Sequence, residues 1–184
     1  SSNREITIHP SIKSIKPYSL YTYMSLSNIS TIIIPETTNC IEHSAFSGCI
    51  SLKHIIISSS VKSIGEYAFN GCKLLEKVTI QAHIAEIGNY IFRKCISLKE
   101  IEIPSSVELI GIGSFYECSL LKEITIPSVT SIGGSAFYGC TSLTQITIPS
   151  VTSIGGSAFY GCTSLTQITI PSVTSIGGSA FYGC

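Results

Sequence analysis

Every phenylalanine in this chain of 184 residues falls on a regular spacing, which constrains the fold more than any other feature. Successive phenylalanines lie 23 residues apart for three steps and 22 apart for the next three, and a cysteine follows each one three residues later. Self-similarity at a period of roughly 20 to 50 residues is typical of solenoids, in which each repeat forms one coil. The phenylalanines are Phe46, Phe69, Phe92, Phe115, Phe137, Phe159 and Phe181.

Each repeat also contains a Leu-x-x-Ile-x-Ile segment, whose alternating β-branched residues predict a short strand with one buried face. Proline commonly follows, as at Pro104 and Pro127, and ends the strand because it lacks an amide donor. A lone coil buries too few apolar side chains to offset its loss of conformational entropy. The coils must therefore stack, and stability belongs to the array.

The turns of the repeat carry a second pattern. An apolar pair three residues apart is usually followed by a glycine such as Gly133, which we interpret as a position that needs positive φ. The segment 135–140, which holds a phenylalanine, is expected to form a short helical or 3₁₀ turn. Lys94 and Glu117 replace the glycine that precedes the cysteine in other copies, which indicates that this position does not require positive φ.

The segment from Ile126 to Ile148 resembles a full unit of the BspA-type leucine-rich repeat family, in phrasing closest to members from amoebal parasites. The resemblance covers about residues 29–184. It implies a mainly β, right-handed solenoid of about eight coils of 22–23 residues, with a parallel sheet on the concave side. Short 3₁₀ or helical turns, or short strands, would form the convex side. The resemblance further implies protein binding or adhesion at cell surfaces and no catalytic residues, so we expect no enzyme.

The two ends of the chain differ. Residues 1–28 are interpreted as a degenerate N-terminal capping coil, with a decayed repeat as the alternative, and residues 29–184 as one continuous array. The sequence stops at Cys184 in mid-repeat, which favours a fragment of a longer array. If the chain were whole, its uncapped last coil would recruit another copy. Residues 127–184 carry no charged side chain and the net charge is zero, and both features favour association.

Several classes of chemistry are not expected. The repeating cysteines should be buried free thiols, because stacked side chains point the same way and suit disulfides poorly. Cys40 lies off this ladder and is the better candidate for a reactive or intermolecular thiol, although a plain buried thiol is the favoured interpretation. No metal-ligand spacing or catalytic motif occurs, so no metal, cofactor or small-molecule substrate is expected. No basic stripe points to nucleic acid, and no run of 18 apolar residues predicts a membrane span.

One candidate binding surface remains, formed by two columns of outward strand positions on the concave face. Varied polar residues on a rigid sheet suit protein recognition, and a merely solvated face is the alternative. The predicted partner-binding residues are His54, Ile56, Lys77, Thr79, Glu100, Glu102, Glu123, Thr125, Gln145, Thr147, Gln167 and Thr169.

Three functional hypotheses follow. The leading one is a non-catalytic protein-binding or adhesion module of a surface or secreted protein, with an unknown protein ligand on the concave face. The second is a self-assembling structural protein whose uncapped coils stack end to end as a homo-oligomer. The third is an intracellular interaction scaffold, since free thiols suit a reducing compartment.

Overall fold

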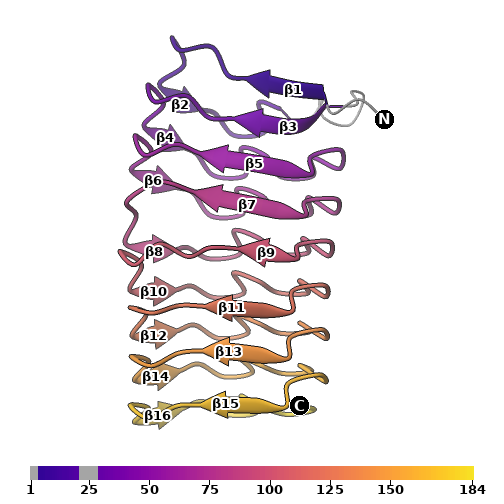
Figure 1. Ribbon diagram of the computed structural model, residues 1–184, viewed down its shortest axis with the longest axis vertical. Helices are drawn as coiled ribbons and strands as arrows, with labels where there is room; N and C mark the ends of the chain where they lie inside the picture. Colours follow the sequence, from indigo (N-terminus) through magenta and orange to yellow (C-terminus); the bar gives the residue numbers. More distant parts are fainter. Residues whose placement is uncertain (1–3, 21–28) are drawn as a thin grey trace.

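The computed structural model describes residues 4–20 and 29–184 and shows a column of stacked coils, each with two strands (Figure 1). The first strand is the longer one in every coil except that of β9 and β10, where both have two residues. These first strands, called the longer strands, are β1 (Arg4–Thr7), β3 (Ile29–Ile33), β5 (His54–Ile57), β7 (Lys77–Ile80), β9 (Glu100–Ile101), β11 (Glu123–Thr125), β13 (Gln145–Thr147) and β15 (Gln167–Thr169). The shorter strands are β2 (Ser14–Ile15), β4 (Cys40–Ile41), β6 (Ser63–Ile64), β8 (Glu86–Ile87), β10 (Leu109–Ile110), β12 (Ser131–Ile132), β14 (Ser153–Ile154) and β16 (Ser175–Ile176).

Strands of successive coils pair in parallel along two sides of the column, as the repeat predicts. The longer strands form two sheets, in the orders β1-β3-β5-β7-β9 and β11-β13-β15. The shorter strands also form two, in the orders β2-β4-β6 and β8-β10-β12-β14-β16. Each ladder is thus interrupted once, between β9 and β11 on one side and between β6 and β8 on the other. The parallel leucine-rich-repeat solenoid is confirmed, with short strands on its second side.

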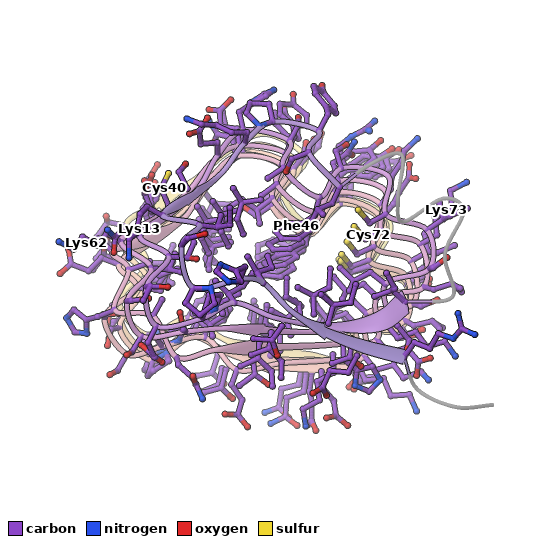
Figure 2. All side chains as sticks on the ribbon, turned by 90° about the horizontal axis from the view of Figure 1, so that it is seen from above. Lys13, Cys40, Phe46, Lys62, Cys72 and Lys73 are labelled. Carbon is purple, nitrogen blue, oxygen red and sulfur yellow. The ribbon has the colours of Figure 1, made fainter. Side chains whose placement is uncertain are left out.

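A single stack of phenylalanine rings runs through the core from the second coil to the last, among buried Ile, Leu, Val, Ala and Cys side chains. Figure 2 looks along this stack and shows Phe46 near its centre, with a row of sulfur atoms that includes Cys72 to one side. From Phe46 to Phe181, adjacent rings have centroids 5.1–5.5 Å apart and planes within 20° of parallel. Large aromatic surfaces removed from water supply much of the stabilisation that the array needs.

The turn that carries each phenylalanine is not helical, so the prediction of a helical or 3₁₀ turn at Ser135–Cys140 is wrong. Alternate amides point in different directions: the Phe137 amide donates to the Ala158 carbonyl of the next coil at 2.7 Å, whereas the Cys140 amide donates to the Phe137 carbonyl at 3.1 Å. A helix would use every amide within its own segment. In this turn, every second amide donates to a carbonyl of the next coil instead. The described residues contain no helix.

Positive φ produces this alternation, at the residues two before and two after each phenylalanine. Lys94 (φ 59°) and Glu117 (φ 57°) adopt it like the glycines at the same position, so the prediction that this position does not require positive φ is wrong. Non-glycine residues pay a steric cost there, which the hydrogen bonds of both neighbouring coils offset. The other position is occupied by Tyr18, Ser44, Tyr67, Tyr90, Gly113, Ser135, Ser157 and Ser179.

The glycine after the apolar pair has a different role from the one predicted. Gly133 is not among the residues with positive φ. A Cβ atom at Gly133 would lie 2.7 Å from the carbonyl carbon of Gly111 in the preceding coil, and one at Gly65 would lie 2.4 Å from the His43 amide nitrogen. At these positions, as at Gly111, Gly155 and Gly177 but not at Gly88, the backbones of adjacent coils approach too closely for any side chain.

The described part of the first segment follows the repeat. Ile6 in β1 pairs with Ile32, and Ile15 in β2 pairs with Ile41. All four residues of β1 are exposed, whereas Ile15 is buried. Residues 1–3 and 21–28 of the predicted capping coil lie outside the described residues, and its capping role stays a prediction.

Candidate functional site

The candidate site is the long-strand face, which we define as the outward side of β3, β5, β7, β9, β11, β13 and β15. Strand register aligns its side chains as the sequence predicts. His54 pairs with Lys77, and Lys77 pairs with Glu100 in the next coil. Past the interruption, Glu123 pairs with Gln145, and Gln145 pairs with Gln167. The first predicted column therefore exists as two aligned runs.

The second column follows the same rule, with Ile33, Ile56 and Thr79 aligned in one sheet and Thr125, Thr147 and Thr169 in the other. Glu102 follows the last residue of β9 and is exposed. Of the predicted binding residues, His54, Ile56 and Thr79 are half-buried and the other nine are exposed. The structure thus places all of them on the long-strand face.

A groove of about 630 Å³ lies where the long-strand ladder is interrupted. It is formed by the residues of β9 and β11 and those next to them, so it brings three predicted residues, Glu100, Glu102 and Glu123, to one place. The interruption coincides with the change in repeat length, because Ile103 to Val107 spans four steps but Ile126 to Val129 spans three. The lining residues are Lys99, Glu100, Ile101, Glu102, Ile103, Lys122, Glu123, Ile124, Thr125 and Pro127.

Charges around this groove are partly paired with the preceding coil. The Lys77 ammonium lies 3.2 Å from a Glu100 carboxylate oxygen, and the Lys99 ammonium lies 3.0 Å from one of Glu76. The hydrogen bond from Lys99 holds the pKa of the Glu76 carboxyl below its usual value. Both pairs are exposed to solvent, so each adds little stability. Their main effect is to pair Glu100 and Lys99 with residues of the preceding coil.

A second groove, of about 310 Å³, lies between β13 and β15 and carries no charge. It is lined by hydroxyl, amide and proline side chains together with two isoleucines, and it includes the predicted residues Gln145, Thr147, Gln167 and Thr169. The long-strand face therefore has two chemically distinct hollows, one acidic and one neutral. Both can accept side chains of a partner, since exposed donors and acceptors surround them.

Sequence reasoning missed these grooves, although the change from 23 to 22 residues and the successive Glu100 and Glu123 were available signals. It also missed a ladder of stacked tyrosines on the turns. The rings of Tyr138 and Tyr160 have centroids 4.8 Å apart, and the Arg93 guanidinium lies 5.4 Å from the Tyr116 ring centroid. Their recurrence one residue after the phenylalanine was the signal.

The ladder cysteines form a row of thiol hydrogen bonds rather than a reactive site. The Cys118 thiol donates to the Phe92 carbonyl of the preceding coil at 3.2 Å, and Cys72 does the same to Phe46 at 3.1 Å. Burial raises the pKa of the Cys118 thiol well above its usual value and that of Cys162 to about 12. A thiol that resists ionisation is a poor nucleophile.

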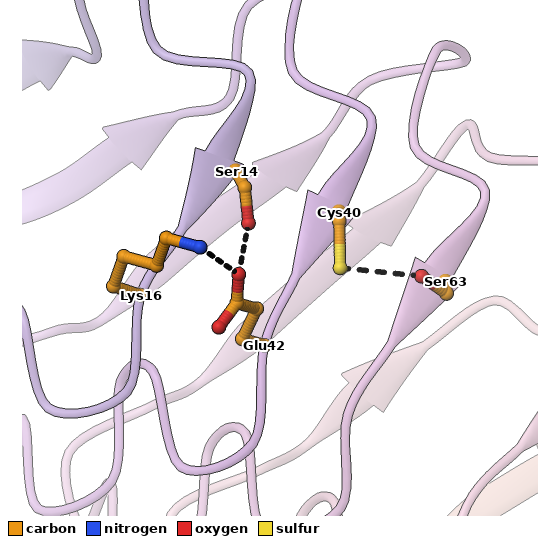
Figure 3. A network of polar contacts seen from close by, with 5 residues as sticks. All are labelled: Ser14, Lys16, Cys40, Glu42 and Ser63. Carbon is orange, nitrogen blue, oxygen red and sulfur yellow. Dashed lines mark hydrogen bonds and ion pairs between the residues drawn. The ribbon is translucent and has the colours of Figure 1, made fainter.

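Cys40 is set apart from this row. Figure 2 shows it on the other side of the column from Cys72, and it is half-buried in β4. The Ser63 hydroxyl donates to its sulfur at 3.3 Å (Figure 3). It is free in the structure, and its predicted reactivity stays a prediction.

Within residues 4–20 and 29–184, no group of three or more His, Cys, Asp or Glu side chains could hold a metal ion. In the same residues, no helix is long and apolar enough to cross a membrane.

A family model described as a BspA type leucine rich repeat region matches residues 19–141 and 130–184 in six copies. Among solved structures, a leucine rich cell surface protein from Faecalibacterium prausnitzii A2-165 is 35% identical with a TM-score of 0.82, over 97% of this chain and 50% of that one. The T. pallidum leucine rich repeat protein TpLRR is 32% identical with a TM-score of 0.81, over 86% of this chain and 78% of that one.

A leucine-rich repeat protein from Bacteroides ovatus is 26% identical with a TM-score of 0.55, over 98% of this chain and 64% of that one. No curated protein matches the chain. The chain spans about half the length of the F. prausnitzii protein. These three structures are bacterial, so the predicted likeness to amoebal members is not supported, and none of the three is described as an enzyme.

Proposed function

The chain belongs to the BspA-type leucine-rich repeat family, and we propose that it is a non-catalytic module that binds a protein through its long-strand face. The observation that carries this proposal is the pair of grooves on that face, one lined by Glu100, Glu102 and Glu123 and the other by neutral side chains. A partner that spans both would meet charge at one end and amides and hydroxyls at the other. Such variation along one rigid face provides specificity.

The construction of the face supports recognition of a macromolecule. Stacked coils hold its side chains in register, so little conformational entropy is lost when a partner orders them. Each groove is open, and few of its polar groups converge on one point. Sites for small ligands, in contrast, are enclosed. Solenoids commonly use such extended surfaces for protein partners.

We place the module at a cell surface, in an adhesive role. The support is the description of the F. prausnitzii structure as a cell surface protein, together with its 35% identity over nearly the whole of this chain. Adhesion needs only reversible binding, which the exposed face allows.

A panel of immobilised extracellular-matrix and cell-surface proteins, probed with the biotinylated chain, tests the proposal. The face variant carries Glu100→Lys, Glu123→Lys, Gln145→Arg and Gln167→Arg. The matched control carries Glu86→Lys, Glu108→Lys, Thr130→Arg and Thr152→Arg, which make the same change in net charge at four exposed residues in or next to the short-strand side. Circular dichroism first establishes that both variants keep the wild-type fold.

We expect saturable binding to at least one member of the panel, lost in the face variant and kept in the control variant. Reversing charge and adding bulk on the contacted face introduces repulsion and steric conflict at once. Absence of saturable binding to any protein, or equal binding by both variants, would exclude the long-strand face as the functional surface.

A further inference from the structure

The interruption between β9 and β11 leaves Ile101 and Ile103 at the base of the acidic groove. Ile101 is 7% exposed, whereas Val78 and Ile124, at the same position in the coils before and after, are 1% and 3% exposed; Ile103 is 7% exposed, close to the 8% of Ile80 one coil earlier. The two coils stay joined elsewhere, because the Phe115 amide donates to Ala136 at 2.8 Å and the shorter strands β10 and β12 remain paired. The opening is therefore local to the long-strand face, with apolar side chains at its base.

Three carboxylates and two ammonium groups line this opening, which gives it a small net negative charge. Successive coils place Glu100 and Glu123 at the same position of the repeat, and like charges in such positions repel. Glu100 is already paired with Lys77 at 3.2 Å, and Lys99 is directed to Glu76 at 3.0 Å. In the described part of the chain, Glu102 and Glu123 make no ion pair. Two carboxylates thus remain available, with only Lys122 as an uncommitted lining cation.

We propose that this groove is an anchor point for an arginine side chain of the partner protein, a proposal that rests on the proposed function. The guanidinium lies between the carboxylates of Glu102 and Glu123, and the aliphatic stem covers the exposed edges of Ile101 and Ile103. The groove joins an acidic rim to an apolar base. Arginine matches it because it joins an apolar stem to a planar cation.

The arrangement agrees with one arginine bridging two coils. Glu102 and Glu123 line the same groove from successive coils, and one guanidinium has five donors, enough to bond to a carboxylate of each coil. Arginine forms paired, charge-assisted hydrogen bonds to carboxylates more readily than lysine does, because its guanidinium is planar. Arginine side chains of this kind are frequent anchors in protein interfaces.

Nuclear magnetic resonance of the ¹⁵N-labelled 184-residue chain tests this inference. The probe is the peptide acetyl-Ala-Thr-Arg-Thr-Ala-amide, and its control replaces arginine by citrulline, which keeps the shape and removes the charge. Residues 99–125 are unlike any other stretch of the chain, so their signals stay distinct even though 128–149 and 150–171 are identical. We expect the arginine peptide to shift the amide signals of residues 100–103 and 122–125, and the citrulline peptide to shift them at least about threefold more weakly.

Two single variants, Glu102→Gln and Glu123→Gln, remove one charge each with little change in shape. We expect each to weaken the peptide about threefold and the double variant about tenfold, because each removes one charge-assisted contact at a partly exposed site. Glu86→Gln is the matched control, since Glu86 is an exposed strand residue on the short-strand side, and it should leave the affinity unchanged.

A double variant that weakens the peptide less than about threefold, equal binding of the citrulline peptide, or shifts that map away from β9 and β11 would overturn the arginine site. The proposed function fails separately, when the chain binds no protein of the panel. A panel partner that is lost by the wider face variant but kept by the Glu102→Gln, Glu123→Gln double variant overturns the arginine anchor alone.

Discussion

At the scale of single residues, two neighbouring glycines of one repeat have different physical roles. A Cβ atom at Gly133 would lie 2.7 Å from the backbone of the preceding coil, whereas the nearest atom to one at Gly134 is the Gly156 carbonyl oxygen at 3.4 Å. Neither residue is among those with positive φ. Only the first is therefore fixed by the distance between coils.

This difference gives a matched pair of substitutions. We expect Gly133→Ala to destabilise the array by about 1–3 kcal/mol, because the backbones of two coils must separate. Gly134→Ala should change the free energy of unfolding by less than about 0.5 kcal/mol. Urea unfolding followed by circular dichroism measures both, and equal effects would contradict the close-approach explanation.

Thiol exposure separates the cysteines in the same way. We expect N-ethylmaleimide to modify Cys40 and Cys184 in the native chain, because these two are not buried. Cys49, Cys72, Cys95, Cys118, Cys140 and Cys162 are buried, and burial raises their pKa values, so they should react only after unfolding. Mass spectrometry with and without urea counts the adducts. Rapid native modification of the six ladder thiols would show that the coils open readily.

The residue scale also shows what the sequence could predict. The phenylalanine spacing was sufficient for the solenoid, the buried cysteines and the outward columns, since each follows from periodicity alone. The conformation of Lys94 was not predictable, because positive φ is imposed by hydrogen bonds to neighbouring coils. The groove at Glu100 and Glu123 was missed for a similar reason: it depends on how two coils of unequal length meet.

At the scale of elements, the interrupted ladder makes β9 and β11 internal edges. Each has one paired neighbour, whereas β13 lies between β11 and β15. Amides at an unpaired edge are open to solvent more often than those inside a sheet. We expect residues 100–103 and 122–124 to exchange hydrogen for deuterium at least about tenfold faster than residues 145–147. Equal protection across these strands would show that the ladder is continuous in solution.

A polar cluster joins the first two coils on the opposite side (Figure 3). The Glu42 carboxylate accepts hydrogen bonds from the Lys16 ammonium at 2.7 Å and the Ser14 hydroxyl at 2.5 Å, which lower the pKa of Glu42. The folded state therefore favours the ionised carboxylate. The stabilisation is complete above the ordinary value of 4.5 and is lost as the pH falls through the lowered pKa.

Carbon-detected titration by nuclear magnetic resonance checks this sign. We expect Glu42 to titrate below 4.5 in the wild-type chain and closer to that value in Lys16→Gln. Lys13→Gln removes a nearby exposed charge but no hydrogen bond to Glu42, so it should leave the titration almost unchanged. An identical Glu42 pKa in wild type and Lys16→Gln would exclude the cluster as its cause.

At the scale of the whole molecule, the charge of the surface side chains changes along the column while the core stays the same. The phenylalanine stack is continuous, yet all charged side chains precede residue 127. The long-strand face therefore runs from mixed charge through an acidic groove to a neutral one. A partner whose charges are complementary to this order would bind in only one orientation along the face.

Self-association of the chain and an intracellular scaffold role both stay predictions. End-to-end self-association would not occupy the long-strand face, because stacking proceeds along the column (Figure 1). Self-association and partner binding are therefore compatible.

The most direct test of the account is the footprint of a bound partner, measured by hydrogen–deuterium exchange on the tightest-binding protein of the panel. The account predicts added protection in β7, β9, β11 and β13, strongest at residues 100–103 and 122–125, with little change in β8, β10 and β12. Protection confined to the shorter strands or to the tyrosine turns would contradict the assignment of the long-strand face as the binding surface.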